Sequence, residues 1–149
     1  MFVVVLDMDE TLGVFENDHF HVRPYVEFML QMLKCMNVDI ILWSLGDDDY
    51  VYQVVNSYLP LIKKFAYKIF ARNEGKESVR LYGYAKSGQH IRDMYEEDIV
   101  LLGVDDQVFV NMDSAYDLKL PIKPYKKPDK MDRVIWCICE KIVKYIVKE

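Results

Sequence analysis

The short apolar run at residues 2–7, FVVVLD, restricts the fold of this chain more than any other feature. It offers no polar side chain to water before Asp7, so it predicts a strand that is buried on both faces. Such strands belong to parallel sheets that helices cover on both sides. Similar runs at 38–43 and 98–106 predict two more strands of the same kind.

Amphipathic segments separate these strands. Residues 23–37 place apolar side chains at helical spacing, with Pro24 near the first turn. Acidic residues favour the start of a helix, and three of them open the helix predicted over 47–59. The closing segment, 129–149, predicts a further amphipathic helix. Strands that alternate with helices indicate a single α/β domain over residues 1–149.

The remaining segments complete the expected sheet. Residues 65–72 alternate with period two and predict a strand, and 119–125 predict a short final one. Residues 73–78, NEGKES, are typical of a turn, and 86–95 predict a helix. The fold class is therefore α/β: a three-layer, Rossmann-like fold with a mostly parallel five-stranded sheet and helices on both faces.

Composition excludes several classes of function. The chain has 149 residues, of which 52% are hydrophobic, and a net charge of −5. This charge argues against general binding of nucleic acid. No apolar segment reaches the length of about 18 residues that spans a bilayer, so no membrane association is expected. Three cysteines without paired spacing suit a reducing compartment, cytoplasmic or nuclear. Richness in Lys, Ile, Tyr and Asp is compatible with an AT-rich genome, such as a viral one.

Pairs of carboxylates follow two of the predicted strands. Asp7 and Asp9 end the first run, and Asp105 and Asp106 end the run at 98–106. Ligands of open α/β sheets bind outside the carboxyl ends of the strands, so both pairs are expected at one edge. Their mutual repulsion would be relieved by a hard cation such as Mg²⁺, which often binds carboxylates together with phosphate oxygens. The alternative is that these are solvated loop residues.

An ordered set of motifs resembles one known family. DMDETL at 7–12, RPYVEF at 23–28, LWS at 42–44, YAK at 84–86 and VDD at 104–106 are similar to the motifs of the haloacid dehalogenase (HAD) superfamily. The form DxDET resembles its branch of carboxy-terminal-domain phosphatases, the NLI-interacting-factor-like proteins. The resemblance implies a Mg²⁺-dependent phosphatase with the HAD fold and no large cap domain.

The resemblance also implies the roles of the catalytic residues. Asp7 corresponds to the nucleophile, which forms an aspartyl-phosphate. Asp9 corresponds to the general acid and base, which protonates the leaving oxygen and then activates water. Ser44 would hydrogen-bond a phosphoryl oxygen, and Lys86 would offset negative charge on Asp7 and on the phosphoryl group.

The expected metal ligands are the Asp7 carboxylate, the Asp9 backbone carbonyl and one side chain of the VDD motif. Asp106 is the first choice for that side chain and Asp105 the second. Two more residues, Thr11 and Arg23, are placed on the substrate side of the site. The Thr11 hydroxyl is expected to stabilise the turn after the first strand. Arg23 either binds substrate phosphate or pairs with an acidic neighbour.

The connections between the motifs are too short for a cap domain, which predicts an open site. An open site favours a phosphorylated protein or peptide as substrate, and a phosphoserine or phosphothreonine phosphatase as the activity. Phe15, Phe20 and Tyr50 are candidates for aromatic contacts with that substrate. Two alternatives remain: a capless phosphatase for small metabolites or phosphotyrosine, and a catalytically weak scaffold that binds phosphopeptides.

Overall fold

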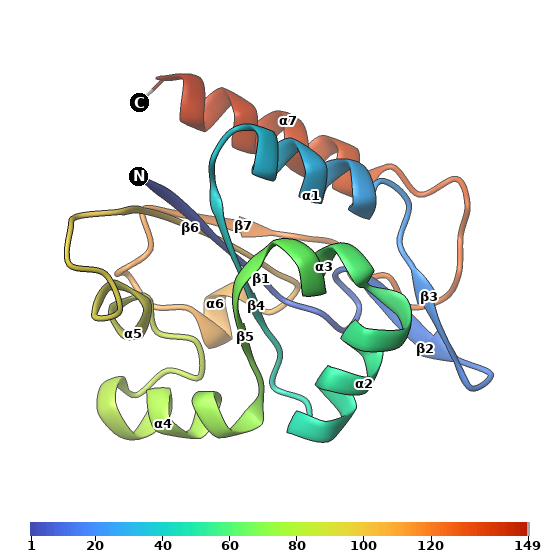
Figure 1. Ribbon diagram of the computed structural model, residues 1–149, viewed down its shortest axis with the longest axis horizontal. Coiled ribbons are helices and arrows are strands. Elements are labelled where there is room, and N and C mark those ends of the chain that lie inside the picture. The colour runs from blue at the N-terminus through green and yellow to red at the C-terminus, as the bar shows by residue number, and fades with distance from the viewer. Residues whose placement is uncertain (149) are drawn as a thin grey trace.

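Five parallel strands form the sheet at the centre of the structure, a computed structural model that describes residues 1–148 (Figure 1). The strands lie in the order β5-β4-β1-β6-β7, and each pairs in parallel with its neighbour. Their bounds are β1 Phe2–Leu6, β4 Asp39–Trp43, β5 Ala66–Phe70, β6 Val100–Asp105 and β7 Leu118–Pro121. The predicted α/β fold with a five-stranded parallel sheet is confirmed.

Helices cover both faces of this sheet, because successive side chains of a strand point to opposite sides. In β1, Val4 and Leu6 join one apolar cluster, whereas Val3 and Val5 join the other. The first cluster lies under α1 Val26–Cys35, α2 Asp48–Tyr58, α3 Pro60–Phe65 and α7 Val134–Lys148. The second cluster lies against α5 Gly88–Arg92 and α6 Val108–Asn111.

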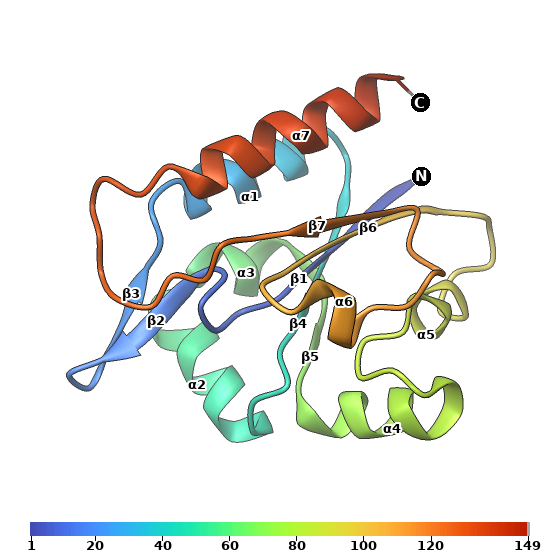
Figure 2. The ribbon, with the colours of Figure 1, turned by 180° about the vertical axis from the view of Figure 1, so that it is seen from behind.

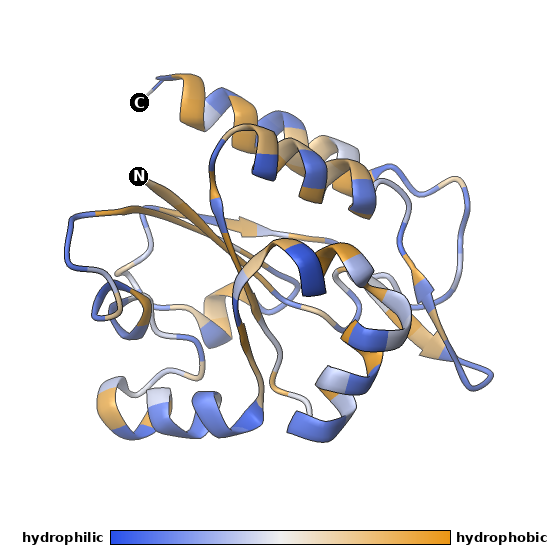
Figure 3. Ribbon diagram, viewed as in Figure 1, coloured by the Kyte–Doolittle hydropathy of each residue, from blue (hydrophilic) through white to orange (hydrophobic). Residues whose placement is uncertain are grey.

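The arrangement of the helices follows from this pattern. The helices α1 and α7 run side by side over the sheet (Figures 1 and 2), and α4 Arg72–Tyr82 lies beside α5. The strands of the sheet are strongly hydrophobic in Figure 3, whereas α4 is largely hydrophilic. Of the helices within residues 1–148, none combines the length and the apolar character that crossing a bilayer requires.

The turn predicted at residues 73–78 is wrong, because these residues lie inside α4. Tertiary packing explains the difference. A Cβ at Gly75 would lie 2.7 Å from Leu45 Cδ2, so glycine lets the helix approach the loop after β4 closely. The helix ends at Gly83, whose φ of 82° is the left-handed conformation of a helix C-terminus.

The helix predicted at 86–95 is shorter than expected and begins after Lys86. Ser87 caps it by accepting a hydrogen bond from the Gln89 backbone N–H. The backbone of Lys86 is instead held by tertiary contacts: its N–H donates to the Asn111 carbonyl oxygen, and its own carbonyl oxygen accepts from the Tyr116 hydroxyl. Lys86 is therefore fixed in the turn that connects α4 and α5.

A two-stranded hairpin, which the sequence did not predict, occupies the connection between β1 and α1. Its strands are β2 Gly13–Glu16 and β3 His19–Val22. Asn17 and Asp18 form the turn with φ values of 54° and 60°, the conformation of a type I′ turn. This hairpin takes the place after the first motif where a cap domain would be inserted.

Candidate active site

Asp7 lies directly after β1, at the carboxyl edge of the sheet. Its side chain accepts hydrogen bonds from the Thr11 hydroxyl on Oδ2, at 2.8 Å, and from Lys86 Nζ on Oδ1, also at 2.8 Å. The chain turns sharply after Asp9, since Glu10 has a φ of 63° and the Leu12 N–H donates to the Met8 carbonyl oxygen. This turn returns the Thr11 hydroxyl to Asp7, so Thr11 makes a local hydrogen bond within the turn.

Lys86 lies between two carboxylates and is completely buried. Its ammonium group is 2.8 Å from Asp7 Oδ1 and 2.6 Å from Asp105 Oδ2. Burial alone would lower the pKa of Lys86, but the two carboxylates outweigh burial and raise it. The same contact holds the pKa of Asp105 below its usual value, although burial opposes this. Lys86 therefore stays charged beside Asp7.

Asp105 is bound on both of its oxygens. Besides Lys86, Oδ2 accepts from the Asn111 amide at 3.2 Å, and Oδ1 accepts from the Gln107 backbone N–H at 2.8 Å. Asp105 thus orients Lys86, and this role was not predicted. Two donors already occupy Asp105 Oδ2, so Asp105 has less free acceptor capacity than Asp7 and stays the second choice, after Asp106, for the third ligand.

The acidic residues at this edge fit a divalent cation. Asp7, Asp105 and Asp106 each offer one oxygen, and these oxygens lie within 4.8 Å of one another. Burial, together with the carboxylates of Asp7 and Asp105, raises the pKa of Asp106 to about 7. Three carboxylates this close together, one of which resists ionisation beside the other two, suit a hard cation such as Mg²⁺. Asp7 and Asp106, with the backbone carbonyl of Asp9, are the residues that would hold it.

Asp9 lies two residues beyond Asp7 and is partly buried. Its Oδ1 accepts a hydrogen bond of 2.6 Å from the Tyr50 hydroxyl at the start of α2. Burial raises the pKa of Asp9, with a further contribution from Asp7, although the Tyr50 contact opposes the rise. Burial and the same contact also raise the pKa of Tyr50, which therefore remains a donor. A carboxyl group with a raised pKa suits an acid that must be protonated before the reaction.

Ser44 follows β4 and is buried. Its Oγ accepts a hydrogen bond from the Gly46 backbone N–H at 3.0 Å. A hydroxyl that accepts in this way can still donate its own proton, for instance to a phosphoryl oxygen. The parallel pairing of β4 with β1 brings the ends of these two strands, and thus Ser44 and Asp7, to the same edge of the sheet.

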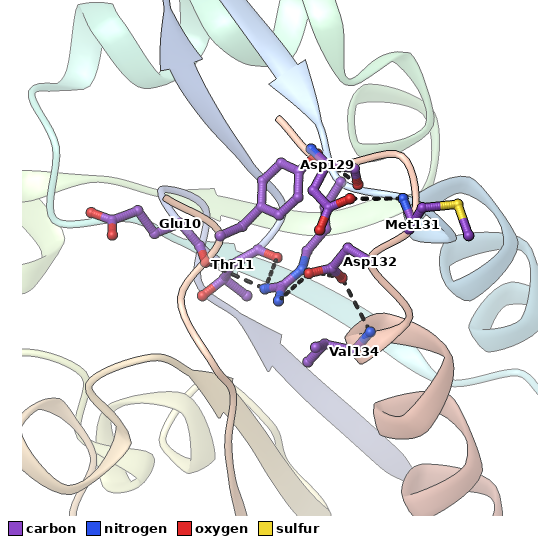
Figure 4. A network of polar contacts seen from close by, with 8 residues as sticks. Glu10, Thr11, Asp129, Met131, Asp132 and Val134 are labelled. Carbon is purple, nitrogen blue, oxygen red and sulfur yellow. Dashed lines mark hydrogen bonds and ion pairs between the residues drawn. The ribbon is translucent and has the colours of Figure 1, made fainter. Parts of the chain in front are cut away.

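Arg23 pairs with an acidic neighbour, which is the second of the two alternatives stated from the sequence (Figure 4). Its guanidinium group is buried and donates to both oxygens of Asp132, at 2.9 and 3.1 Å. It also contacts the Glu10 and Thr11 carbonyl oxygens at 3.4 Å and lies over the Tyr125 ring. Arg23 thereby connects the turn after Asp9 with the segment before α7.

This pairing predicts a structural effect for changes at Asp132. Asp132→Asn should lower the free energy of unfolding by about 3 kcal/mol, because it leaves a buried guanidinium without a counter-ion. The Asn side chain still offers Oδ1 to the Val134 N–H, so the start of α7 keeps its cap. Chemical denaturation measures the effect, with Asp129→Asn in the same segment as the control. An Arg23→Met variant with undiminished stability but a greatly raised KM would show instead that Arg23 binds substrate.

Fold and site together define a class of protein. A buried carboxylate held by a buried lysine lies beside an acidic group at the carboxyl edge of a Rossmann-like sheet, which is the arrangement that the resemblance to HAD phosphatases implies. Residues 2–148 match the family model described as NLI interacting factor-like phosphatase, and the chain belongs to this family. This match confirms the resemblance to this branch that the sequence motifs indicated.

Solved structures agree with this fold. One match is the fission yeast RNA polymerase II CTD phosphatase Fcp1-R271A bound to beryllium fluoride, with a TM-score of 0.57 and 12% identity. Another is Fcp1, described as an essential RNA polymerase II CTD phosphatase, with a TM-score of 0.58 and 13% identity. Each alignment covers 99% of this chain but only 51% and 50% of the other, so the chain spans about half the length of these proteins. The comparison with curated proteins gave no match.

Proposed function

We propose that this phosphatase hydrolyses phosphoserine or phosphothreonine in proteins, with Mg²⁺ as its cofactor and an aspartyl-phosphate on Asp7 as its intermediate. The observation that carries the proposal is the buried contact between Asp7 and Lys86, with the Asp9 carboxyl two residues away. The short hairpin after the first motif supports a protein substrate, because it leaves this edge without a cap-sized cover. The Fcp1 proteins, which are described as phosphatases of a polymerase domain, support it by analogy.

In the first step, an Asp7 oxygen attacks phosphorus, and the bond between phosphorus and the ester oxygen breaks. The proton of Asp9 passes to the leaving oxygen, so the alcohol departs neutral. Lys86 offsets the charge that Asp7 and the phosphoryl oxygens share, and the Ser44 hydroxyl donates to one of those oxygens. When bound by Asp7, Asp106 and the Asp9 carbonyl, Mg²⁺ supplies Lewis-acid polarisation of the phosphoryl group.

In the second step, water attacks the phosphorus of the aspartyl-phosphate. The Asp9 carboxylate takes a proton from this water, the bond between phosphorus and Asp7 breaks, and inorganic phosphate leaves. Thr11 and Lys86 hold the two Asp7 oxygens through both steps, so the same oxygen returns to its starting position. Asp9 is protonated again and ready for the next turnover.

The raised pKa of Asp106 makes the stability of the metal-free protein depend on pH. Its pKa is about 7 in the folded state and near the ordinary value of 3.8 in the unfolded chain. The folded state therefore binds more protons between these values, and its stability falls as the pH rises from about 4 to 7. Mg²⁺ requires the ionised form, so it should stabilise the protein more at pH 8 than at pH 5.

Thermal unfolding in EDTA and in Mg²⁺ at pH 5 and pH 8 measures both effects. Asp106→Asn should remove the Mg²⁺ stabilisation and flatten the pH dependence of the metal-free protein, while Asp98→Asn, an exposed change, should leave both intact. Equal stabilisation by Mg²⁺ at the two pH values would contradict the assignment of Asp106 as a ligand.

A panel of substrates tests the substrate class. We expect kcat/KM to be higher for phosphoserine and phosphothreonine peptides than for sugar phosphates or phosphotyrosine peptides, with all activity lost in EDTA. A preference for small metabolites would instead favour the second candidate, a capless metabolite phosphatase. Tight binding of phosphopeptides without turnover would favour a scaffold.

A further inference from the structure

Tyr50 contacts Asp9 at this edge of the sheet and has no part in the two chemical steps described above. It lies in the first turn of α2 and donates its hydroxyl to Asp9 Oδ1 at 2.6 Å. The two residues are 41 positions apart in the chain, and the parallel pairing of β4 with β1 brings them together. The contact therefore depends on the sheet and is not a local turn.

Two segments of the chain lie close to the ring of Tyr50. The Phe15 ring of the hairpin meets it edge to face, with the ring centroids 6.1 Å apart. The ring also lies close to Gly46, where a Cβ would be 3.1 Å from Tyr50 Cδ2. The Gly46 N–H also fixes the Ser44 hydroxyl. The loop that places Ser44 and the hairpin after the first motif thus fix the direction of the Tyr50 hydroxyl.

This direction determines which oxygen of Asp9 carries the acidic proton. Tyrosine is the donor in this contact, so Asp9 Oδ1 acts as an acceptor. In the protonated carboxyl group the proton then lies on Oδ2, the oxygen that Tyr50 does not contact. Without Tyr50 the carboxyl group could rotate and exchange the two oxygens, and a misplaced acid transfers its proton less well.

We propose that Tyr50 is a positioning residue, which orients the Asp9 carboxyl group so that Oδ2 carries the proton toward the leaving oxygen. The inference rests on the proposed function, in which Asp9 is the acid. As the ester bond breaks, the proton moves from Oδ2 to the ester oxygen and leaves a carboxylate, whose Oδ1 still accepts from Tyr50. The hydroxyl of Tyr50 keeps its own proton throughout.

The experiment compares leaving groups. Loss of a well-placed acid slows esters of poor leaving groups, such as the serine alkoxide, but hardly affects aryl esters whose leaving group needs no proton. Tyr50→Phe keeps the ring and its contact with Phe15 and removes only the hydroxyl. We expect it to lower kcat for a phosphoserine peptide roughly ten- to hundredfold, with less than about a threefold change for 2,4-dinitrophenyl phosphate.

Two controls make the result specific. Tyr52→Phe, two residues along the same helix, removes an exposed hydroxyl and should leave both rates unchanged. In an Asp9→Asn background, Tyr50→Phe should add no further loss, because the proton that it positions is gone. An equal loss for both leaving groups, or no loss for either, would overturn the inference.

The same measurements distinguish a failure of the proposed role of Tyr50 from a failure of the proposed phosphatase function. If the wild-type protein hydrolyses neither ester, the phosphatase chemistry itself is refuted. If the wild-type protein hydrolyses both esters and Tyr50→Phe changes the two rates equally, only the role of Tyr50 is refuted. Thermal unfolding shows whether Tyr50→Phe is folded. If it is not, Tyr50→Met, which also lacks a donor, must show the same dependence on the leaving group.

Discussion

Asp7→Asn is expected to lower kcat for a generic aryl phosphate in Mg²⁺ by at least about 10⁴-fold, because the amide cannot serve as the nucleophile. The variant has the same shape, and its amide oxygen still accepts one of the hydrogen bonds that Asp7 accepts from Thr11 and Lys86. It should therefore remain folded. Steady-state kinetics beside thermal unfolding measure both expectations.

Asp98→Asn is the matched control for this substitution, since Asp98 is exposed and precedes β6, at the edge of the parallel sheet opposite to Asp7. It should retain the wild-type rate. Turnover by Asp7→Asn close to that of the control would refute the role of Asp7, and with it the aspartyl-phosphate. Incubation with beryllium fluoride and Mg²⁺ gives a second readout, because only a protein with the Asp7 carboxylate should form a stable mimic of the phosphorylated enzyme.

Lys86→Met is expected to affect both stability and activity. It removes the cation between Asp7 and Asp105 and leaves two buried carboxylates without their partner. The free energy of unfolding should fall by about 3–5 kcal/mol near neutral pH. The rate should fall by roughly 10²- to 10³-fold, since the positive charge beside the phosphoryl group is lost. Urea denaturation and kinetics measure the two effects separately.

A second substitution separates the two roles of Lys86. The double variant Lys86→Met/Asp105→Asn also removes the negative charge of Asp105, which Lys86→Met alone leaves unpaired. Part of the lost stability should therefore return, while the activity stays low. A double variant that recovers activity as well would show that Lys86 acts only through the structure.

The sequence was sufficient to predict the sheet because its strands are continuous apolar runs. The runs that became β1, β4 and β6 have few polar residues, and this is the pattern of strands that helices cover on both faces. The same reasoning placed the carboxylates at the strand ends. By contrast, α4 was misread because Gly75 and its turn-forming neighbours satisfy turn rules locally, whereas the helix is stabilised by packing against Leu45.

Some parts of the site could not be inferred from local patterns. The contact of Lys86 with Asp105 spans 19 residues, that of Tyr50 with Asp9 spans 41, and that of Arg23 with Asp132 spans 109. Each depends on which strands are neighbours in the sheet or on where the last helix packs. The hairpin did leave a signal, since Asn17 and Asp18 are residues that tolerate a left-handed conformation between two short apolar segments.

The pairing of Arg23 with Asp132 has a consequence for how this chain can be shortened. Every residue placed at the catalytic edge lies within residues 7–111, so a fragment that stops at Tyr125 would retain all of these side chains. Such a fragment would lack Asp132, so the buried guanidinium group of Arg23 would have no counter-ion. This unpaired charge would lie against the turn that carries Thr11. The segment before α7 thus holds the turn after Asp9 in place through Arg23. Shortened versions of the domain should therefore include α7.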